Sequence, residues 1–361
     1  MKGKRVAVAM SGGIDSSVAA ARLKDAGYEV IGFTMKLWEF DRAGSETEVL
    51  GGHYCSPEMF EEARRVCRQL GIPHYVLNMK RQFEEIVVND FISEYLQGRT
   101  PNPCILCNSR IKWQVFEHRT RQLECDHLAT GHYARISCDA GSGRYQLRKG
   151  LDPERDQTYF LWGLTQQSLA RTLFPLGEMK KREVREFAQE YELTSPERKE
   201  SREVCFVPDD DYPRLLKRRY PDIPGSGNIR DMAGNIVGEH RGYYRYTIGQ
   251  RKGIEINTTE KHYVVSIDPE ANEIVVGSED DLWSDYFEAV DLNWVSIEPP
   301  EEELPVEVKI RYRHEPAAAQ LTILTGGRAG VRLSQRQRAI TPGQSAVFYD
   351  GDLLLGGGRI A

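Results

Sequence analysis

The stretch Val6-Ala7-Val8-Ala9-Met10-Ser11-Gly12-Gly13-Ile14-Asp15-Ser16-Ser17 decides the fold of the first part of the chain. The apolar run at 6–10 predicts a buried strand, and residues 15–26, which stop before a glycine, predict a helix. Between them, Gly12 and Gly13 let the backbone turn sharply and approach a ligand without interference from a Cβ atom. A strand, a glycine turn and a helix in this order form a cradle of N–H groups for an anion.

The side chains beside the glycines suit a nucleoside triphosphate. The hydroxyls of Ser11, Ser16 and Ser17 add donors for phosphate oxygens. Asp15 offers a carboxylate for the Mg²⁺ that accompanies ATP. The stretch lacks the Gly-Lys-Ser/Thr ending of a Walker loop, which excludes that class of ATP site. A tight turn with an ordinary serine cap is the simpler alternative, but it does not account for this concentration of polar groups.

The segments that follow predict a doubly wound α/β domain. Strands are expected at 29–37, 74–77 and 128–130, and helices at 57–70, 83–96, 111–123, 161–173 and 182–191. Alternation of strands and helices implies right-handed crossovers and a mostly parallel sheet that is covered on both faces.

After Ser195-Pro196 the pattern changes to short alternating runs. Those at 236–246, 262–267 and 273–276 predict a small β-rich middle domain, and those at 306–312, 319–324, 330–333 and 345–349 predict a C-terminal β-barrel. We place the three domains at 1–205, 206–279 and 280–361. A chain of 361 residues is consistent with more than one core.

The charge and the cysteines narrow the setting. A formal net charge of -6 does not indicate a nucleic-acid partner, so any such binding must be local, and basic clusters do accumulate from Lys180 onward. One of them, at 243–252, mixes tyrosines with Arg and Lys, which is the composition of a base-stacking surface or, alternatively, of a buried hairpin with a basic edge. Without an apolar stretch long enough to span a bilayer, we expect a cytoplasmic protein with reduced thiols and no membrane partner.

Two segments place cysteines where their chemistry matters. Thr100-Pro101-Asn102-Pro103-Cys104-Ile105-Leu106-Cys107-Asn108 reads as a proline-stiffened loop before a helix, whose dipole is expected to lower the pKa of the thiols. Ser201-Arg202-Glu203-Val204-Cys205 offers a third thiol, with Lys199 and Arg202 as a positive field. Cys67 is expected in the core, and His53-Tyr54-Cys55 is expected to be structural.

The glycine-serine loop resembles that of the ATP pyrophosphatases, the PP-loop superfamily. With further motifs, the chain resembles one of its families, the bacterial tRNA-specific 2-thiouridylases. The motifs, in family order, are residues 11–17, 100–108, Gly131-His132-Tyr133, residues 155–160, 203–208 and 246–253, and Pro342-Gly343-Gln344. The resemblance implies a PP-loop domain, a middle domain and a C-terminal barrel. It also implies an enzyme that uses ATP to convert the wobble uridine of lysine, glutamate and glutamine tRNAs to 2-thiouridine.

The resemblance also implies residue roles. Cys205 would receive persulfide sulfur from a relay protein or cysteine desulfurase, and Cys107 would release it through a transient disulfide. ATP contacts would come from Ala9, Met10, Ser11, Gly12, Gly13, Ile14, Asp15, Ser16, Ser17, Met35 and Gly131. Contacts with tRNA and its target base would come from Asn102, Pro103, Cys104, His132, Arg155, Asp156, Gln157, Arg311, Tyr312 and Gln344.

Cys104 departs from the family pattern, which often has Asp at this position. The replacement creates Cys-x-x-Cys, and with Cys205 as a third ligand it could hold a [4Fe–4S] cluster with one open iron that binds sulfide. Zinc is less favoured, because four ligands are usual and no second Cys-x-x-Cys exists. A persulfide relay, a cluster and an inert pair of thiols stay open here. An amidating or condensing ligase for a small molecule and a non-catalytic tRNA-binding protein are the competing functions.

Overall fold

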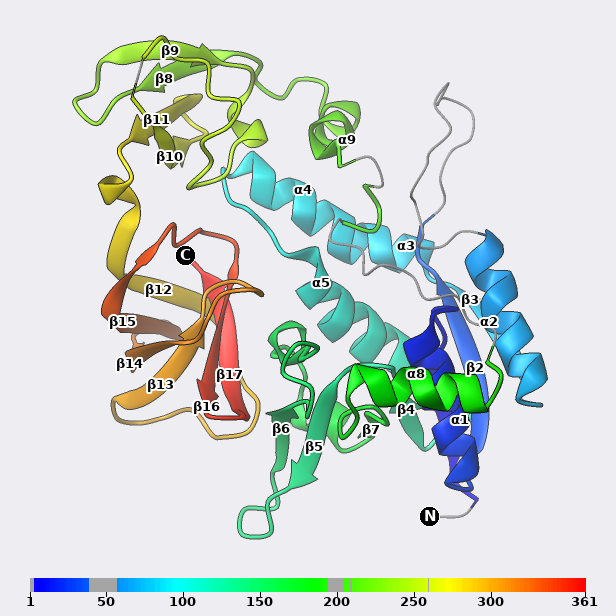
Figure 1. Ribbon diagram of the computed structural model, residues 1–361. Coiled ribbons are helices and arrows are strands. Elements are labelled where there is room, and N and C mark those ends of the chain that lie inside the picture. The colour runs from blue at the N-terminus through cyan, green and yellow to red at the C-terminus, as the bar shows by residue number, and fades with distance from the viewer. Residues whose placement is uncertain (1–2, 39–56, 194–203, 208–209, 259) are drawn as a thin grey trace.

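The computed structural model describes residues 3–38, 57–193, 204–207, 210–258 and 260–361, in three consecutive regions of the chain (Figure 1). The predictions for His53-Tyr54-Cys55, for a helix cap at Ser56, and for Lys199 and Arg202 fall outside these residues. Among the described residues, none of the helices has the length and apolar character needed to cross a membrane.

A parallel sheet forms the centre of the first region. Its order is β3-β2-β1-β4-β7, built from β1 (Arg5–Ala9), β2 (Glu29–Lys36), β3 (His74–Asn78), β4 (His127–Ala129) and β7 (Thr172–Leu173). Every neighbouring pair is parallel. The order runs one way from β1 to β3 and the other way from β1 to β7, so the switch point lies between β1 and β4, where ligands of doubly wound sheets bind. The predicted fold class is confirmed.

Successive side chains of β1 point to opposite faces of the sheet, and those on both faces are apolar. Helices therefore cover both faces. Val6 and Val8 pack in one cluster with residues of α1 (Ile14–Asp25), α2 (Pro57–Gln69) and α8 (Lys181–Glu190). Ala7 packs on the other face with a second helical layer. That layer consists of α3 (Lys80–Phe83), a π-helical turn η1 (Glu84–Val88), α4 (Asn89–Leu96), α5 (Pro103–Leu106), the π-helical η2 (Cys107–Phe116) and α6 (Glu117–Gln122).

Two helix predictions need correction. The helix expected at 111–123 begins at Pro103, because the side chain of Asn102 accepts a hydrogen bond from the Cys104 N–H and a proline suits the first turn. Cys104 and Cys107 therefore lie within the helical segment and not in a loop before it. The helix expected at 161–173 is wrong, since only α7 (Gln166–Leu169) forms there, between the 3₁₀ turn η3 (Thr158–Phe160) and β7. At β7, Thr172 is buried and accepts a 2.7 Å hydrogen bond from Trp113, so tertiary packing overrides the helical pattern.

The middle region follows α9 (Tyr212–Arg219) and contains a sheet of order β10-β11-β8-β9. Its strands are β8 (Gly227–Arg230), which the sequence analysis missed, β9 (Ile236–His240), β10 (Tyr263–Asp268) and β11 (Glu273–Gly277). The run expected as a strand to residue 246 ends earlier, in the 3₁₀ turn η4 (Tyr243–Arg245). Tyr243, Tyr244 and Tyr246 are buried, so the prediction of a base-stacking surface there is wrong. The Tyr243 hydroxyl instead donates to the carbonyl of Leu96 at 2.8 Å, at the end of α4.

A closed β-barrel forms the C-terminal region, as predicted. It consists, after the 3₁₀ turn η5 (Asp280–Leu282), of β12 (Trp283–Trp294), β13 (Leu304–Lys309), β14 (Ala317–Leu324), β15 (Arg328–Arg338), β16 (Ser345–Asp350) and β17 (Leu353–Ile360). Pairing of β12 with both β15 and β17 closes the sheet.

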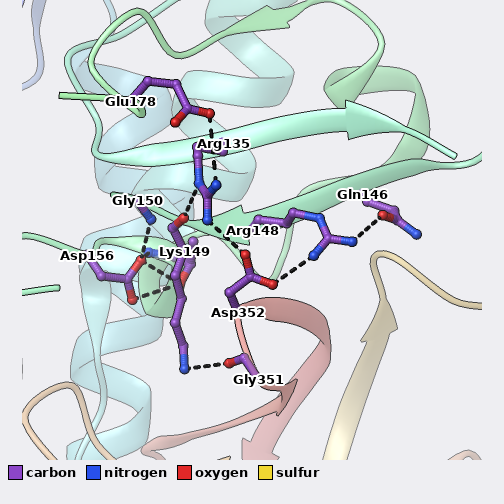
Figure 2. Close-up of polar contacts among 10 residues, drawn as sticks. Arg135, Gln146, Arg148, Lys149, Gly150, Asp156, Glu178, Gly351 and Asp352 are labelled. Atoms are coloured by element: carbon purple, nitrogen blue, oxygen red, sulfur yellow. Dashed lines mark hydrogen bonds and ion pairs between the residues drawn. The ribbon is translucent and has the colours of Figure 1, made fainter. Parts of the chain in front are cut away.

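A hairpin from the first region extends the barrel sheet. It consists of β5 (Ala134–Cys138) and β6 (Tyr145–Lys149), and β6 pairs with β17. Asp352, in the turn between β16 and β17, accepts hydrogen bonds from Arg135 at 2.8 Å and Arg148 at 2.7 Å (Figure 2). The sequence analysis missed this hairpin, which joins the first region to the barrel. The proposed domain boundaries at 205 and 279 stay predictions.

The buried carboxylate of Glu94, at the end of α4, gives a first test of how the regions hold together. It forms ion pairs with Arg99 and with Arg359 of β17, and its side chain is only 3% exposed. Glu94→Ala leaves both guanidinium groups without this partner, so we expect a loss of about 2 kcal/mol of stability, measured as a lower midpoint in thermal unfolding. The control Glu85→Ala removes an exposed pair with Arg81 and should cost less than about 0.5 kcal/mol. Equal shifts for the two variants would show that the Glu94 network does not stabilise this junction.

Candidate active site

The glycine turn lies at the carboxyl end of β1, beside the switch point of the sheet. Gly12 has φ +73°, and a Cβ atom at this position would lie 2.8 Å from the carbonyl oxygen of Met59. Gly12 is therefore required both for its backbone conformation and for its contact with α2. Gly13 is the N-cap of α1, so the first N–H groups of this helix point into the turn.

The serines divide into an exposed one and two buried ones. The Ser17 side chain is fully buried and donates to the carbonyl of Gly13 at 2.9 Å. Ser16, 4% exposed, donates to the same carbonyl at 3.0 Å and accepts from the N–H of Ser11 at 3.2 Å. Both hydroxyls thus bond back to the start of their own helix in the nucleotide-free protein, and their contact with phosphates stays a prediction. Ser11 is exposed and keeps a hydroxyl at the rim of the turn.

Asp15 is the centre of a polar cluster that the sequence analysis did not foresee. Its carboxylate accepts hydrogen bonds from the Lys181 ammonium at 2.7 and 2.8 Å and from the Tyr133 hydroxyl at 2.7 Å. Gly131, which follows β4, presses against the same turn, since a Cβ atom there would lie 2.9 Å from the carbonyl carbon of Asp15. The fold therefore brings together the predicted residues Asp15 and Gly131, and it adds Lys181 from α8.

The remaining predicted ATP residues form the surroundings of the turn. Ala9 ends β1, and the N–H of the buried Met10 donates to the Phe33 carbonyl at 2.7 Å. Met35 lies on the neighbouring β2 and is partly buried, and Ile14 is the first residue of α1. These residues lie at or just after the end of β1, on β2, or at the start of α1, around one edge of the sheet.

The three candidate cysteines differ in their surroundings. Cys104 is exposed, whereas Cys107 and Cys205 are partly buried and pack against the same hydrophobic cluster. Phe206, the neighbour of Cys205, packs on Phe83 and Phe91 with ring centroids 5.6 and 5.2 Å apart, which seats this segment on the second helical layer.

The structure bears on two expectations about the thiols, the lowered pKa and the alternative of a cluster. The surrounding protein raises the pKa of the Cys104 thiol, and nearby Lys112 opposes this shift only in part, so the expected lowering by the helix dipole is wrong for Cys104. Within the described residues, which include Cys104, Cys107 and Cys205, no three His, Cys, Asp or Glu side chains are arranged to hold a metal. This conformation does not fit a cluster on the three cysteines. Cys67 is buried, as predicted, and burial raises its pKa to about 12.

Lys112 is a second cation that the sequence analysis missed. Its ammonium donates to the side chain of Asn108 at 2.7 Å, and the amide of this buried asparagine donates to the carbonyl of Phe160 at 3.1 Å. The spacing from Cys104 to Asn108 to Lys112 is four residues each time, which places all three on one side of a helix. This spacing is the feature of the sequence from which Lys112 could have been predicted to lie near Cys104.

Several predicted tRNA contacts have structural partners. The Asp156 carboxylate is buried and accepts from the N–H and hydroxyl of Thr158 at 3.2 and 2.9 Å, and burial raises its pKa. Gln157 accepts from the N–H of Tyr133 at 3.1 Å. The Tyr312 ring packs on Phe160 with centroids 4.4 Å apart. These side chains connect the 3₁₀ turn η3 to the barrel and to the residues after β4.

Gln344 also has partners within the chain. Its side-chain amide donates to the carbonyls of Thr100 at 2.8 Å and Pro101 at 3.4 Å, and the N–H of Thr100 donates to the carbonyl of Pro342 at 2.9 Å. The Pro-Gly-Gln motif of the barrel thus holds the segment that leads into Asn102 and the buried Pro103. Arg311 is exposed, and Arg155 is partly exposed, so their positions leave contact with a partner open.

His132 allows a test by pH. Burial, followed by the charge of Lys112, lowers the pKa of His132 well below its usual 6.5, and its ring nitrogen lies 2.6 Å from the Thr130 hydroxyl. As the pH falls below about 6.5, the unfolded chain takes up a proton at His132 and the folded protein does not, so the folded state loses stability. We expect His132→Gln to lose less stability than the wild type between pH 7 and pH 5, measured by urea unfolding at each pH. Parallel curves would contradict the neutral state of the partly buried His132 in the folded protein.

Family models cover almost the whole chain. Residues 4–209 match the model described as tRNA methyl transferase HUP domain, residues 214–278 the tRNA methyl transferase PRC-barrel domain, and residues 284–360 the aminomethyltransferase beta-barrel domain.

Curated relatives match at full length. The tRNA-specific 2-thiouridylase MnmA of Geotalea uraniireducens (strain Rf4) is 49% identical over 359 residues, which are 99% of this chain and 95% of the relative. MnmA of Geobacter metallireducens is 46% identical over 357 residues, or 99% and 96% of the two chains. MnmA of Caldicellulosiruptor saccharolyticus is 45% identical, with 99% and 98% covered.

A glycine-serine turn at the switch point of a HUP-type sheet, followed by matches to a PRC-barrel and a second β-barrel domain, places the chain among the RNA-modifying proteins of the PP-loop class. Within that class, the chain is nearly half identical to tRNA-specific 2-thiouridylases along its full length. The chain belongs to the family of tRNA-specific 2-thiouridylases.

Proposed function

We propose that this protein is a tRNA-uridine 2-sulfurtransferase that uses ATP to replace the 2-oxygen of the wobble uridine in lysine, glutamate and glutamine tRNAs with sulfur. The observation that carries the proposal is one chain with a phosphate turn around Gly12, a helix bearing Cys104 and Cys107, and a third thiol at Cys205, along with full-length thiouridylase relatives. We also propose that the protein acts in the cytoplasm.

The turn around Gly12 supports the activation step. The uracil 2-oxygen attacks the α-phosphorus of ATP, the bond to the bridging oxygen breaks, and pyrophosphate leaves with that electron pair. The N–H groups at the start of α1 are oriented before the reaction, so they stabilise the charge that develops on pyrophosphate. Asp15 offers the carboxylate that would hold Mg²⁺, which supplies further charge neutralisation for the phosphates.

The cysteines support the sulfur step. A relay protein or cysteine desulfurase loads Cys205 as a persulfide. The Cys107 thiolate attacks the Cys205 sulfur, a Cys107–Cys205 disulfide forms, and hydrosulfide leaves. Hydrosulfide adds to C2 of the adenylated uracil, and AMP departs with the former 2-oxygen. A thiol reductant restores the two thiols before the next turnover.

Two further observations bear on this proposal. Cys107 and Cys205 are 98 positions apart, and both pack, partly buried, against one large hydrophobic cluster that also includes residues of the middle region and the barrel. The three cysteines do not form a metal-holding group among the described residues, so we favour the persulfide over the cluster.

The direct test uses the full chain with unmodified lysine tRNA, Mg-ATP and a persulfide donor. The tRNA is digested and its nucleosides are separated and weighed by mass spectrometry. We expect 2-thiouridine at the wobble position, in amounts that rise with ATP. The same reaction without the persulfide donor is the control. Wobble uridine that stays unmodified in the complete reaction would refute the proposal.

A further inference from the structure

The phosphate turn lacks a lysine of its own. In a Walker loop, the lysine of Gly-Lys-Ser/Thr reaches the β- and γ-phosphates and offsets their charge. Here residues 11–17 contain no Lys or Arg, and Asp15 adds a negative charge. A cation from elsewhere in the fold would add to the charge neutralisation by Mg²⁺ and by the N–H groups of α1 when a triphosphate binds at this turn.

Lys181 brings a cation to the turn from 166 residues away. It is the first residue of α8, which packs with α1 in one hydrophobic cluster on the same face of the sheet. The Lys181 N–H donates to the side chain of Asp152 at 2.9 Å, which fixes the start of the helix. Its side chain is only 13% exposed and pairs with Asp15.

The geometry leaves Lys181 able to donate further. Its ammonium has three N–H groups, and the contacts with Asp15 at 2.7 and 2.8 Å use at most two of them. The Tyr133 hydroxyl donates to the same carboxylate, so Asp15 keeps one partner if the ammonium turns toward another anion. Most of the ammonium is shielded from water, which strengthens its attraction to an anion.

We infer that Lys181 is the phosphate-binding lysine of this site: it holds Asp15 in the nucleotide-free protein and contacts the β- and γ-phosphates when ATP binds. This inference rests on the proposed function, since it requires an ATP site at the turn. Lys181 of α8 would thus do what the lysine within a Walker loop does, which is to bind the β- and γ-phosphates. When pyrophosphate leaves, the ammonium stabilises the charge that it carries away.

The test compares two ligands on the full chain by isothermal titration calorimetry. One is the magnesium complex of an ATP analogue with a methylene bridge between the α- and β-phosphates, and the other is AMP. Lys181→Met should weaken binding of the analogue by about tenfold or more, since hydrogen bonds to charged groups are lost, and binding of AMP by less than about twofold. Lys181→Arg keeps the charge and should restore part of the lost affinity. Lys180→Met removes the exposed neighbouring lysine and should bind both ligands as the wild type does.

The outcomes separate this inference from the function on which it rests. If the wild type binds the analogue and Lys181→Met binds it equally well, the role of Lys181 is wrong and the ATP site stands. If Lys181→Met weakens both ligands equally while Lys181→Arg does not recover, the lysine is structural and the inference fails. A wild type that does not bind the analogue overturns both. Thermal melting of each variant shows that a loss of binding does not arise from unfolding.

Discussion

Cys205→Ser is expected to abolish formation of 2-thiouridine, with a fall of more than about 10³-fold in the rate of product formation. Serine keeps the shape of the side chain but cannot carry a persulfide. The activation step needs no thiol, so the variant should still release pyrophosphate from ATP when tRNA is present. The measurement pairs nucleoside mass spectrometry with a pyrophosphate assay on the same samples.

Two other cysteines serve as controls for this prediction. Cys107→Ser should lose product to the same extent, because no thiolate then remains to release the sulfur. Cys138→Ser changes an exposed thiol at the end of β5, in the hairpin that extends the barrel, and should keep wild-type activity. Product formation by Cys205→Ser at the wild-type rate would rule out the persulfide route.

Gly12→Ala is expected to weaken ATP binding by about 100-fold or more. The methyl group would lie 2.8 Å from the Met59 carbonyl, and alanine is strained at φ +73°, so the turn must shift away from its present form. Both effects act on the backbone that presents the N–H groups. Calorimetry with the methylene analogue of ATP measures the loss.

Gly143→Ala is the control for Gly12→Ala, because it introduces similar backbone strain without a steric clash. Gly143 has φ +70°, close to that of Gly12, but a Cβ atom there would meet nothing within 4 Å. This variant should cost about 1 kcal/mol of stability and leave ATP affinity unchanged. Wild-type affinity in Gly12→Ala would show that the turn does not bind the phosphates in its present form.

The sequence predicted the parts of the fold that repeat a simple pattern. Residues 6–10 are apolar on both sides because β1 is covered on both faces, and Gly27 and Gly71 have positive φ just beyond α1 and α2. These features are local, so they can be recognised in a short stretch. The helix start at Pro103 is also encoded locally, by the cap at Asn102 and by the proline. The two prolines of this segment are equally typical of a loop, which is what we predicted.

Features that depend on distant partners could not be predicted in this way. The β5–β6 hairpin forms because its residues pair with β17, more than 200 positions later. The tyrosines at 243–246 have the composition of a binding surface, but Tyr243 is buried and bonds to Leu96 across two regions of the chain. Composition alone does not show which side of a domain another domain covers.

In the candidate site, too, local features could be predicted from the sequence and contacts between distant residues could not. The turn at 11–17 was recognised from adjacent residues, whereas Lys181 reaches Asp15 only through the packing of α8 on α1. Gln344 is assigned to tRNA by resemblance, which stays a prediction, and its side chain bonds to the carbonyls of Thr100 and Pro101, more than 240 positions earlier. This bond between the barrel and the segment before the cysteine-bearing helix could not be predicted from the motif alone.

If ATP turns the uracil 2-oxygen into a leaving group, that oxygen must end in the phosphate of AMP. A lysine tRNA carrying ¹⁸O at C2 of the wobble uridine is incubated with the enzyme, Mg-ATP and a persulfide donor. The AMP and the digested tRNA are then analysed by mass spectrometry. Because AMP departs with the former 2-oxygen, we expect one ¹⁸O in the phosphate of AMP for each 2-thiouridine formed. AMP without the label, in a reaction that does form 2-thiouridine, would contradict it.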